Sequence, residues 1–253
     1  MNDRIYSFRA KDGPACLMMA TASLLLAASI ASAGISPPVL EMDVQVFSTA
    51  DTNTPLYDQT VLPSKSGSLG PAGNNAWGFD VGVFNPNFNI TGEINASPTI
   101  SPTAAFLNPT LNFTNNSTES LWFMVSIKMP TSHLFPLPLE WASSASWTLT
   151  GPQPELTTLS DTPLWAVSTD AGSLGSLFED STAMNNNNLN ISNNMSGPLG
   201  GSVAEFMMID LAFELSPNAV GGVNGLFTVV PAPGALALLG CAGLFGTKRR
   251  RRI

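Results

Sequence analysis

The segment from Gly34 to Val230 contains no cysteine and no arginine, although the whole chain has two cysteines and ten basic residues. The two cysteines, Cys16 and Cys241, lie in apolar segments near the ends of the chain. The segment between them therefore has no disulfide framework, no thiolate metal site and no cysteine nucleophile. Its fold must be stabilised by packing alone.

Positive charge is almost absent from the same segment. It holds 16 acidic residues against two lysines, Lys65 and Lys128, which gives a net charge of −14. A surface of this sign repels nucleic acid and anionic lipid headgroups. We therefore expect no nucleic-acid partner.

Histidine is also scarce, because His133 is the only one in the chain. A count of one excludes a histidine cluster that would hold a metal ion. A hydrolase triad would need His133 as its base, but no Gly-x-Ser-x-Gly elbow accompanies it. We interpret His133 as a structural or solvent-exposed residue and predict no catalytic residues and no enzyme.

The N-terminus has the three parts of an export signal. Arg4, Arg9 and Lys11 form a positive region, an apolar stretch follows from Ala15 to Ile30, and Ala31-Ser32-Ala33 supplies small residues for cleavage. Residues 1–33 are therefore predicted to be a signal peptide, helical before its removal by signal peptidase, which would recognise Ala31 and Ala33 and cleave after Ala33. The secretion machinery is the partner that this implies.

The C-terminus carries a second targeting segment, which we assign to residues 226–253. It combines a proline-containing motif, an apolar run over 234–246 that we predict to be a short transmembrane helix, and a basic cluster that would stay cytoplasmic and stall export. The motif is Val230, Pro231, Ala232, Pro233, Gly234 and Ala235, and the cluster is Lys248, Arg249, Arg250, Arg251 and Arg252.

The apolar run is short for a membrane span. At about 1.5 Å per residue, 13 helical residues extend roughly 20 Å, against a hydrocarbon core of about 30 Å. We expect it to hold a precursor only with help from Phe227 to Val229 or from local thinning of the bilayer.

This tail resembles the PEP-CTERM sorting signal of exopolysaccharide-producing Gram-negative and planctomycete-like bacteria. In that family a Pro-Glu-Pro motif precedes a short transmembrane helix and an arginine cluster. Pro231 and Pro233 match the two prolines, while Ala232 stands where the family has glutamate. The resemblance implies an inner-membrane-tethered precursor, an exosortase-type membrane protease as partner, and a final location at the cell surface or outside the cell.

Other anchors fit less well. A glycolipid anchor signal ends in its hydrophobic tail, whereas this chain ends in a basic cluster. A sortase signal needs Leu-Pro-x-Thr-Gly, which the chain lacks. A single-span anchor that is never processed remains an alternative.

The body between the two targeting segments, residues 34–225, is predicted to be all-β. Apolar and polar residues alternate with period two in several segments, and turn formers separate them. The predicted strands are Leu40–Val46, Trp77–Val83, Leu121–Lys128, Val203–Leu215 and Gly225–Val229, and the predicted turns include 85–87, 115–118, 151–152, 197–198 and 221–222. This pattern indicates an antiparallel β-sandwich, either a jelly roll or an immunoglobulin-like fold. The asparagine-rich segment Asp180–Gly201 is predicted to be an exposed loop.

Candidate ligand groups in the body are few. We expect no cofactor, and calcium is the one metal with candidate ligands, in Asp51 to Asn53 with Asp58 and in Asp161 with Asp170. Solvated turn residues are the simpler interpretation of both. Five tryptophans are candidates for sugar stacking, although core packing is the default for each: Trp77, Trp122, Trp141, Trp147 and Trp165.

Two function classes follow from these patterns. The first is an exported, non-catalytic surface or matrix protein, with carbohydrate (including exopolysaccharide) or calcium as candidate ligands. The second is a secreted glycan-active enzyme that uses Glu140 and Glu155 as paired carboxylates.

Overall fold

The computed structural model divides the chain into two units, Met1–Ile35 and Ser36–Ile253, and all of the residues it describes belong to the second. The described residues are 37–68, 76–98, 104–131, 139–159, 162–179, 183–186, 189–200, 203 and 205–232. The predicted signal peptide and its cleavage residues Ala31 and Ala33 lie outside them.

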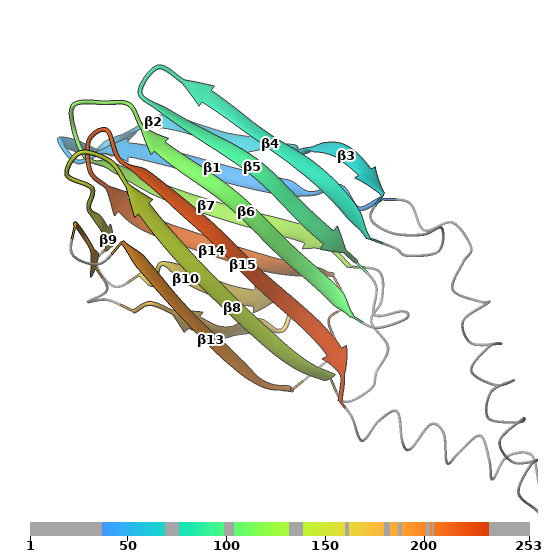
Figure 1. Cartoon of the computed structure of the whole chain (residues 1–253). Coiled ribbons are helices and arrows are strands. Elements are labelled where there is room, and N and C mark those ends of the chain that lie inside the picture. The colour runs from blue at the N-terminus through green and yellow to red at the C-terminus, as the bar shows by residue number, and fades with distance from the viewer. Residues whose placement is uncertain are drawn as a thin grey trace, which may run out of the picture. The chain divides into compact units, whose positions relative to one another are not determined.

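The described residues form two antiparallel sheets and no helix, which confirms the all-β prediction. Figure 1 shows the two sheets as layers that face each other. One sheet has eight strands: β1 (Glu41–Ser48), β2 (Asp51–Val61), β7 (Leu121–Pro130), β9 (Leu156–Thr158), β10 (Trp165–Thr169), β11 (Gly172–Leu177), β12 (Ala183–Met184) and β14 (Phe206–Leu215). The other has seven: β3 (Ser64–Ser68), β4 (Trp77–Asn85), β5 (Phe88–Ser97), β6 (Ala105–Asn115), β8 (Leu139–Thr150), β13 (Asn190–Leu199) and β15 (Val220–Pro231).

Period-two alternation places the apolar residues between the sheets. In β1, Met42, Val44 and Val46 are buried while Glu41 and Asp43 are exposed. The strands β4, β7 and β14 alternate in the same way. The alternating segments of the sequence are therefore confirmed as strands, each with one face in the core.

Aromatic side chains fill the middle of this core. Phe113 of the seven-stranded sheet contacts Phe123 and Phe213 of the eight-stranded sheet, with ring centroids 5.6 and 5.0 Å apart. Trp147 packs on Phe213 from the seven-stranded side at 5.0 Å. Burial of large rings contributed by both layers holds the two sheets together.

The strand pairing is nested. β6 pairs with β15, β7 with β14, β8 with β13, β9 with β12, and β10 with β11. The strand orders are β11-β10-β14-β7-β1-β2 in one sheet and β13-β8-β15-β6-β5-β4-β3 in the other. The second half of the chain thus folds back along the first, and successive pairs alternate between the sheets over most of this length.

Two predictions about the second half of the chain are wrong. The segment predicted to be an exposed loop contains β12 and the ten-residue strand β13, and the predicted turn at 197–198 lies inside β13. The glycine pair at 221–222, predicted to be a turn, lies inside β15. Pairing with β8 and β6 overrides the weak β propensity of asparagine and glycine.

Candidate functional site

The outer faces of the two sheets differ in chemistry. The outer face of the eight-stranded sheet carries the exposed carboxylate of Asp43 and the half-buried carboxylates of Asp210 and Glu214, and Trp122 Nε1 donates a hydrogen bond to Glu214. Partial burial raises the pKa of Asp210, although the hydroxyl of Ser126 donates to its carboxylate and opposes that shift. The acidity of the body is therefore prominent on this face.

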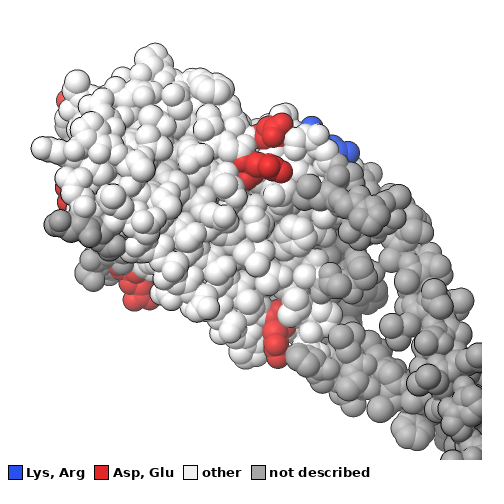
Figure 2. Space-filling model, viewed as in Figure 1, with Lys and Arg blue, Asp and Glu red and all other residues white. Residues whose placement is uncertain are grey.

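The seven-stranded sheet also exposes Asp80, Glu93 and Glu140, but the middle of β8 and β15 presents hydroxyl and amide groups instead. Figure 2 shows this face, where acidic residues lie over β4 and β5 and near the edges, whereas the region over the middle of β8 and β15 carries no charge. Outward positions of β8 hold Ser144, Ser146 and Thr148, and those of β15 hold Asn224 and Thr228. The middle of the face is therefore polar and neutral.

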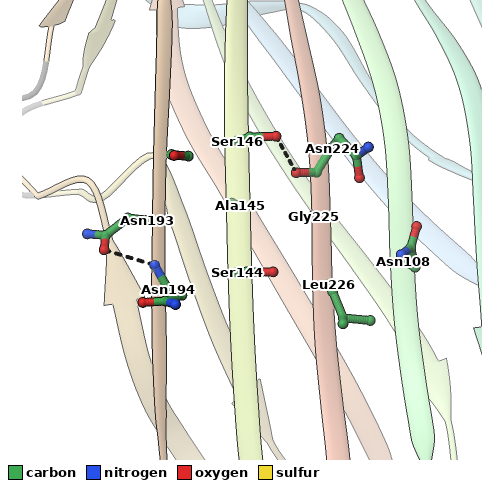
Figure 3. A pocket seen from close by; sticks show the side chains of 10 residues that line it. Asn108, Ser144, Ala145, Ser146, Asn193, Asn194, Asn224, Gly225 and Leu226 are labelled. Carbon is green, nitrogen blue, oxygen red and sulfur yellow. Dashed lines mark hydrogen bonds between the residues drawn. The ribbon is translucent and has the colours of Figure 1, made fainter.

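A groove of about 660 Å³ crosses this neutral region. Residues of β6, β8, β13 and β15 line it, including Asn108, Ser144, Ser146, Asn194, Asn224 and Leu226. Figure 3 shows these side chains on four neighbouring strands around the groove. Smaller hollows that share Ser144, Ser146 and Asn224 continue it along β8 toward Ala142 and Thr148. The groove and these hollows together extend roughly 20 Å along the strand.

The groove coincides with an interruption of the sheet. β15 pairs with β6 at Asn224–Thr110 and again at Phe227–Leu107, whereas Gly225 and Leu226 have no partner in β6. The register places Pro109 opposite Gly225, and proline has no N–H to donate. The small side chains of β8 at this level add little bulk. Pro109 and these small residues together account for the groove.

Several polar side chains in the groove are free to bind a ligand. The amides of Asn108, Asn194 and Asn224 and the hydroxyl of Ser144 have no hydrogen-bond partner among the described residues. The amide oxygen of Asn95, opposite Asn108 in the register, is buried and unpaired as well. The four groups that line the groove come from four strands and offer both donors and acceptors.

The chemistry available in the groove is binding. Its lining residues include no ionisable side chain, so the described residues place no general acid, general base or metal-binding carboxylate there. Amides and hydroxyls form neutral hydrogen bonds with groups that both donate and accept. The groove therefore suits an extended, uncharged, polyhydroxylated ligand.

The two carboxylates considered for glycoside hydrolysis are far apart. Glu140 lies at the start of β8, opposite Val230, whereas Glu155 follows the end of that strand and its backbone N–H binds Ser216 Oγ. The length of β8 puts the two sites roughly 30 Å apart. Glycosidase carboxylates are about 5–10 Å apart, so Glu140 and Glu155 do not form such a pair.

The candidate calcium ligands are also separated. Asp51 starts β2 rather than lying in a turn-rich segment, and seven residues of strand, about 20 Å, separate it from Asp58. The backbone N–H of Asn53 donates to the Asp51 carboxylate and lowers its pKa. Asp161 lies outside the described residues, and Asp170 is exposed beside the turn between β10 and β11. No group of three or more potential metal ligands occurs within the described part of the chain.

Four of the five tryptophans belong to the core. Trp77, Trp141, Trp147 and Trp165 are buried, and Trp122 alone is partly exposed, on the acidic face. None of the five lines the neutral groove. His133 lies outside the described residues.

The sorting motif begins inside the fold. Val230 and Pro231 are the last residues of β15 and pair with Glu140 and Leu139. The strand therefore includes residues 226–231, which the sequence assigned to the tail. Ala232 follows the strand, while the motif from Pro233 onward and the basic cluster Lys248 to Arg252 lie outside the described residues.

This strand corrects one expectation about the membrane segment. Phe227 and Val229 are fully buried between the sheets, so they cannot lengthen a transmembrane helix while the body is folded. Within the described residues, no helix has the length and apolar character needed to cross a bilayer.

The neutral groove is the feature that sequence reasoning missed. Its residues come from segments as distant as Asn108 and Asn224, and three of its four strands, β6, β8 and β13, were not predicted. A usable signal was present in the serine and asparagine residues at alternate positions, such as Ser144, Ser146 and Asn194.

Comparison with known proteins adds little. No family model and no curated protein matches the chain. A chain in the solved structure of infectious bursal disease virus, strain Gx, is similar over 79% of this chain, with 10% identity and a TM-score of 0.22. The similarity covers 53% of that chain, so this protein spans about half of its length. A TM-score this low carries no argument about fold or function.

Proposed function

We propose that this chain is an exported cell-surface or extracellular-matrix protein whose body binds a neutral polysaccharide. The observation that carries the proposal is the neutral groove, with unpaired amides and a hydroxyl from several strands. Its ligand class follows from its chemistry, because each sugar hydroxyl both donates and accepts hydrogen bonds, as do asparagine and serine side chains.

The body is assigned to the jelly-roll class of sandwiches. The nested pairing of β6 to β15 supports this assignment, because rolling up one long antiparallel hairpin produces that order. Jelly rolls include lectin domains. The fold is thus compatible with sugar binding, while the ligand class rests on the groove.

The charge of the body and the neutrality of the groove indicate which class of polysaccharide the groove favours. A body with a net charge of −14 repels anionic polymers, and the groove contains no lysine or arginine to offset that repulsion. It contains no carboxylate to attract a cationic polymer either. A neutral chain, including a neutral exopolysaccharide, is therefore the favoured ligand.

Replacing two groove amides, Asn108→Ala with Asn224→Ala, is expected to weaken binding of a neutral polysaccharide about ten- to thirtyfold, since each lost hydrogen bond contributes about 1 kcal/mol. The measurement is a titration of the purified body against neutral, anionic and cationic polysaccharides. Asn89→Ala, on the same face but outside the groove, is the matched control. Equal affinity of the double variant and the control for every polymer would reject the groove as the binding site.

Export and sorting form the other half of the proposal. We propose that signal peptidase removes residues 1–33 and that an exosortase-type membrane protease processes the tail of an inner-membrane-tethered precursor. The resemblance of Val230 to Ala235 and Lys248 to Arg252 to a PEP-CTERM signal supports it. With β15 ending at Pro231, the motif emerges directly from the folded body.

Deleting Lys248 to Ile253 is expected to abolish processing of the tail, because the basic cluster would no longer stop the chain in the membrane. Intact-mass analysis of the protein from cells and from the medium checks this. The control replaces each of the four arginines from Arg249 to Arg252 by lysine, which keeps the charge. An unchanged mature mass and location after the deletion would contradict the sorting role.

A further inference from the structure

One edge of the seven-stranded sheet is a long strand with an open side. β13 pairs with β8 along its whole length, from Asn190–Thr148 to Leu199–Leu139. On its other side, no described strand pairs with it, because β13 ends the order of its sheet. Such an edge presents backbone N–H and C=O groups that can pair with another strand.

The other sheet edges carry features that discourage strand addition. β2 contains Asp51, Pro55 and Asp58, and its pairing with β1 is irregular. β3 has only five residues, includes Lys65 and has a register shift beside it. Charge, proline, bulges and short length are the usual protections of exposed edges.

Of the remaining edge strands, β12 has only two residues, and β11 has six and is covered in part by β13 itself. A β-carbon added at Gly175 of β11 would lie 2.9 Å from Met195 Sδ of β13. Among the described strands, β13 is therefore the long edge strand that is available to pair with a strand of another chain.

β13 lacks these protections. Its sequence contains no ionisable residue, its pairing with β8 shows no register shift, and its only proline, Pro198, is next to last in the strand. In a body with a net charge of −14, a neutral edge is where two copies approach with least repulsion.

We propose that two copies of this chain associate by antiparallel pairing of β13 with β13, around a two-fold axis near Asn193 and Asn194. A strand paired antiparallel with its own copy is matched in length and in its backbone donors and acceptors, as a two-fold interface requires. The two seven-stranded sheets then form one continuous sheet. Asn193 and Asn194 also line the neutral groove, so the grooves of the two copies meet at the interface.

Cysteine cross-linking in the full-length protein tests the pairing. With Cys16 and Cys241 replaced by serine, cysteines are introduced one at a time at Ser192, Asn193, Asn194 and Ser196, and Thr52→Cys on the β2 edge is the control. Opposed residues of antiparallel strands have Cα atoms about 4.5–5.5 Å apart, within the range of a disulfide. After mild oxidation of cells, the disulfide-linked dimer fraction at Asn193 or Asn194 should exceed the control by more than tenfold.

The pattern along the strand distinguishes pairing from random collision. Dimer yield should peak at Asn193 or Asn194 and fall at least fivefold two positions away, where partner residues are roughly 13 Å apart. With the cysteine at Asn193, the further substitution Asn194→Lys should reduce the dimer yield at least fivefold. With the cysteine at Asn194, Asn193→Lys should have the same effect. Yields no higher than that of the Thr52 control, equal yields at all four positions, or no effect of the lysine would overturn the proposal. The result does not depend on glycan binding, because the strand edge alone forms the cross-link.

Discussion

Replacing Gly225 by alanine is expected to destabilise the body by about 3 kcal/mol or more, the upper range for overpacking a core. An added β-carbon would lie 2.2 Å from Cη2 and 2.6 Å from Cζ3 of Trp165. The indole is fully buried, and its Nε1 donates a 2.9 Å hydrogen bond to Ser143 Oγ, which in turn donates to the Leu226 carbonyl. The ring cannot move aside without breaking this buried chain of hydrogen bonds.

Urea unfolding followed by tryptophan fluorescence measures the effect of Gly225→Ala. Gly67→Ala in β3 is the control, because an added β-carbon there meets no atom within 4 Å. Alanine at Gly67 should change the free energy of unfolding by less than about 1 kcal/mol, partly through the entropy of the unfolded chain. Unfolding midpoints that agree for the two variants would contradict the close packing of Trp165 against β15.

Replacing Asn115 by alanine is expected to cost about 3 kcal/mol, because several buried backbone groups would lose their partners at once. Asn115 is fully buried at the end of β6. Its Nδ2 donates to the carbonyls of Glu119, Leu215 and Ser216 at 2.8, 2.9 and 3.1 Å. Its Oδ1 accepts from the backbone N–H and the hydroxyl of Ser117. One side chain thus joins the loop after β6 to the end of β14 in the other sheet.

The neighbouring residue offers a control for Asn115→Ala. Asn116 is exposed, and the hydrogen bond recorded for it uses its backbone N–H, which alanine retains. Asn116→Ala should therefore leave the thermal midpoint within about 2 °C of the parent protein, whereas Asn115→Ala should lower it by about 6–12 °C. A fall of similar size in both variants would indicate that the loop itself, rather than the buried amide, limits stability.

Strands with strict alternation were predictable from the sequence. Leu40 to Val46 and Leu121 to Lys128 place one apolar residue at every second position, and both form strands with buried inner faces. β13 was not predictable in this way. Its inward positions include Asn193 and Gly197, so hydrophobic period and β propensity are both weak, and pairing with β8 decides its structure.

The groove depends on relations that a linear pattern does not contain. Pro109 interrupts a ladder only because β15 lies beside β6, and Asn194 reaches the groove only because β13 lies beside β8. The contact between Gly225 and Trp165 likewise joins the two sheets. In contrast, the sorting tail is recognised from contiguous residues, and it stays a prediction because its residues from Pro233 to Ile253 lie outside the described residues.

The side-chain amide resonances of the isotope-labelled body, followed by NMR during titration with a neutral oligosaccharide, test the central claim most directly. The account predicts saturable shifts of the Asn108, Asn194 and Asn224 amides, while that of Asn53 on β2 of the other sheet stays unchanged. Shifts confined to the acidic face of the eight-stranded sheet, or no saturable shifts with any neutral oligosaccharide, would contradict it.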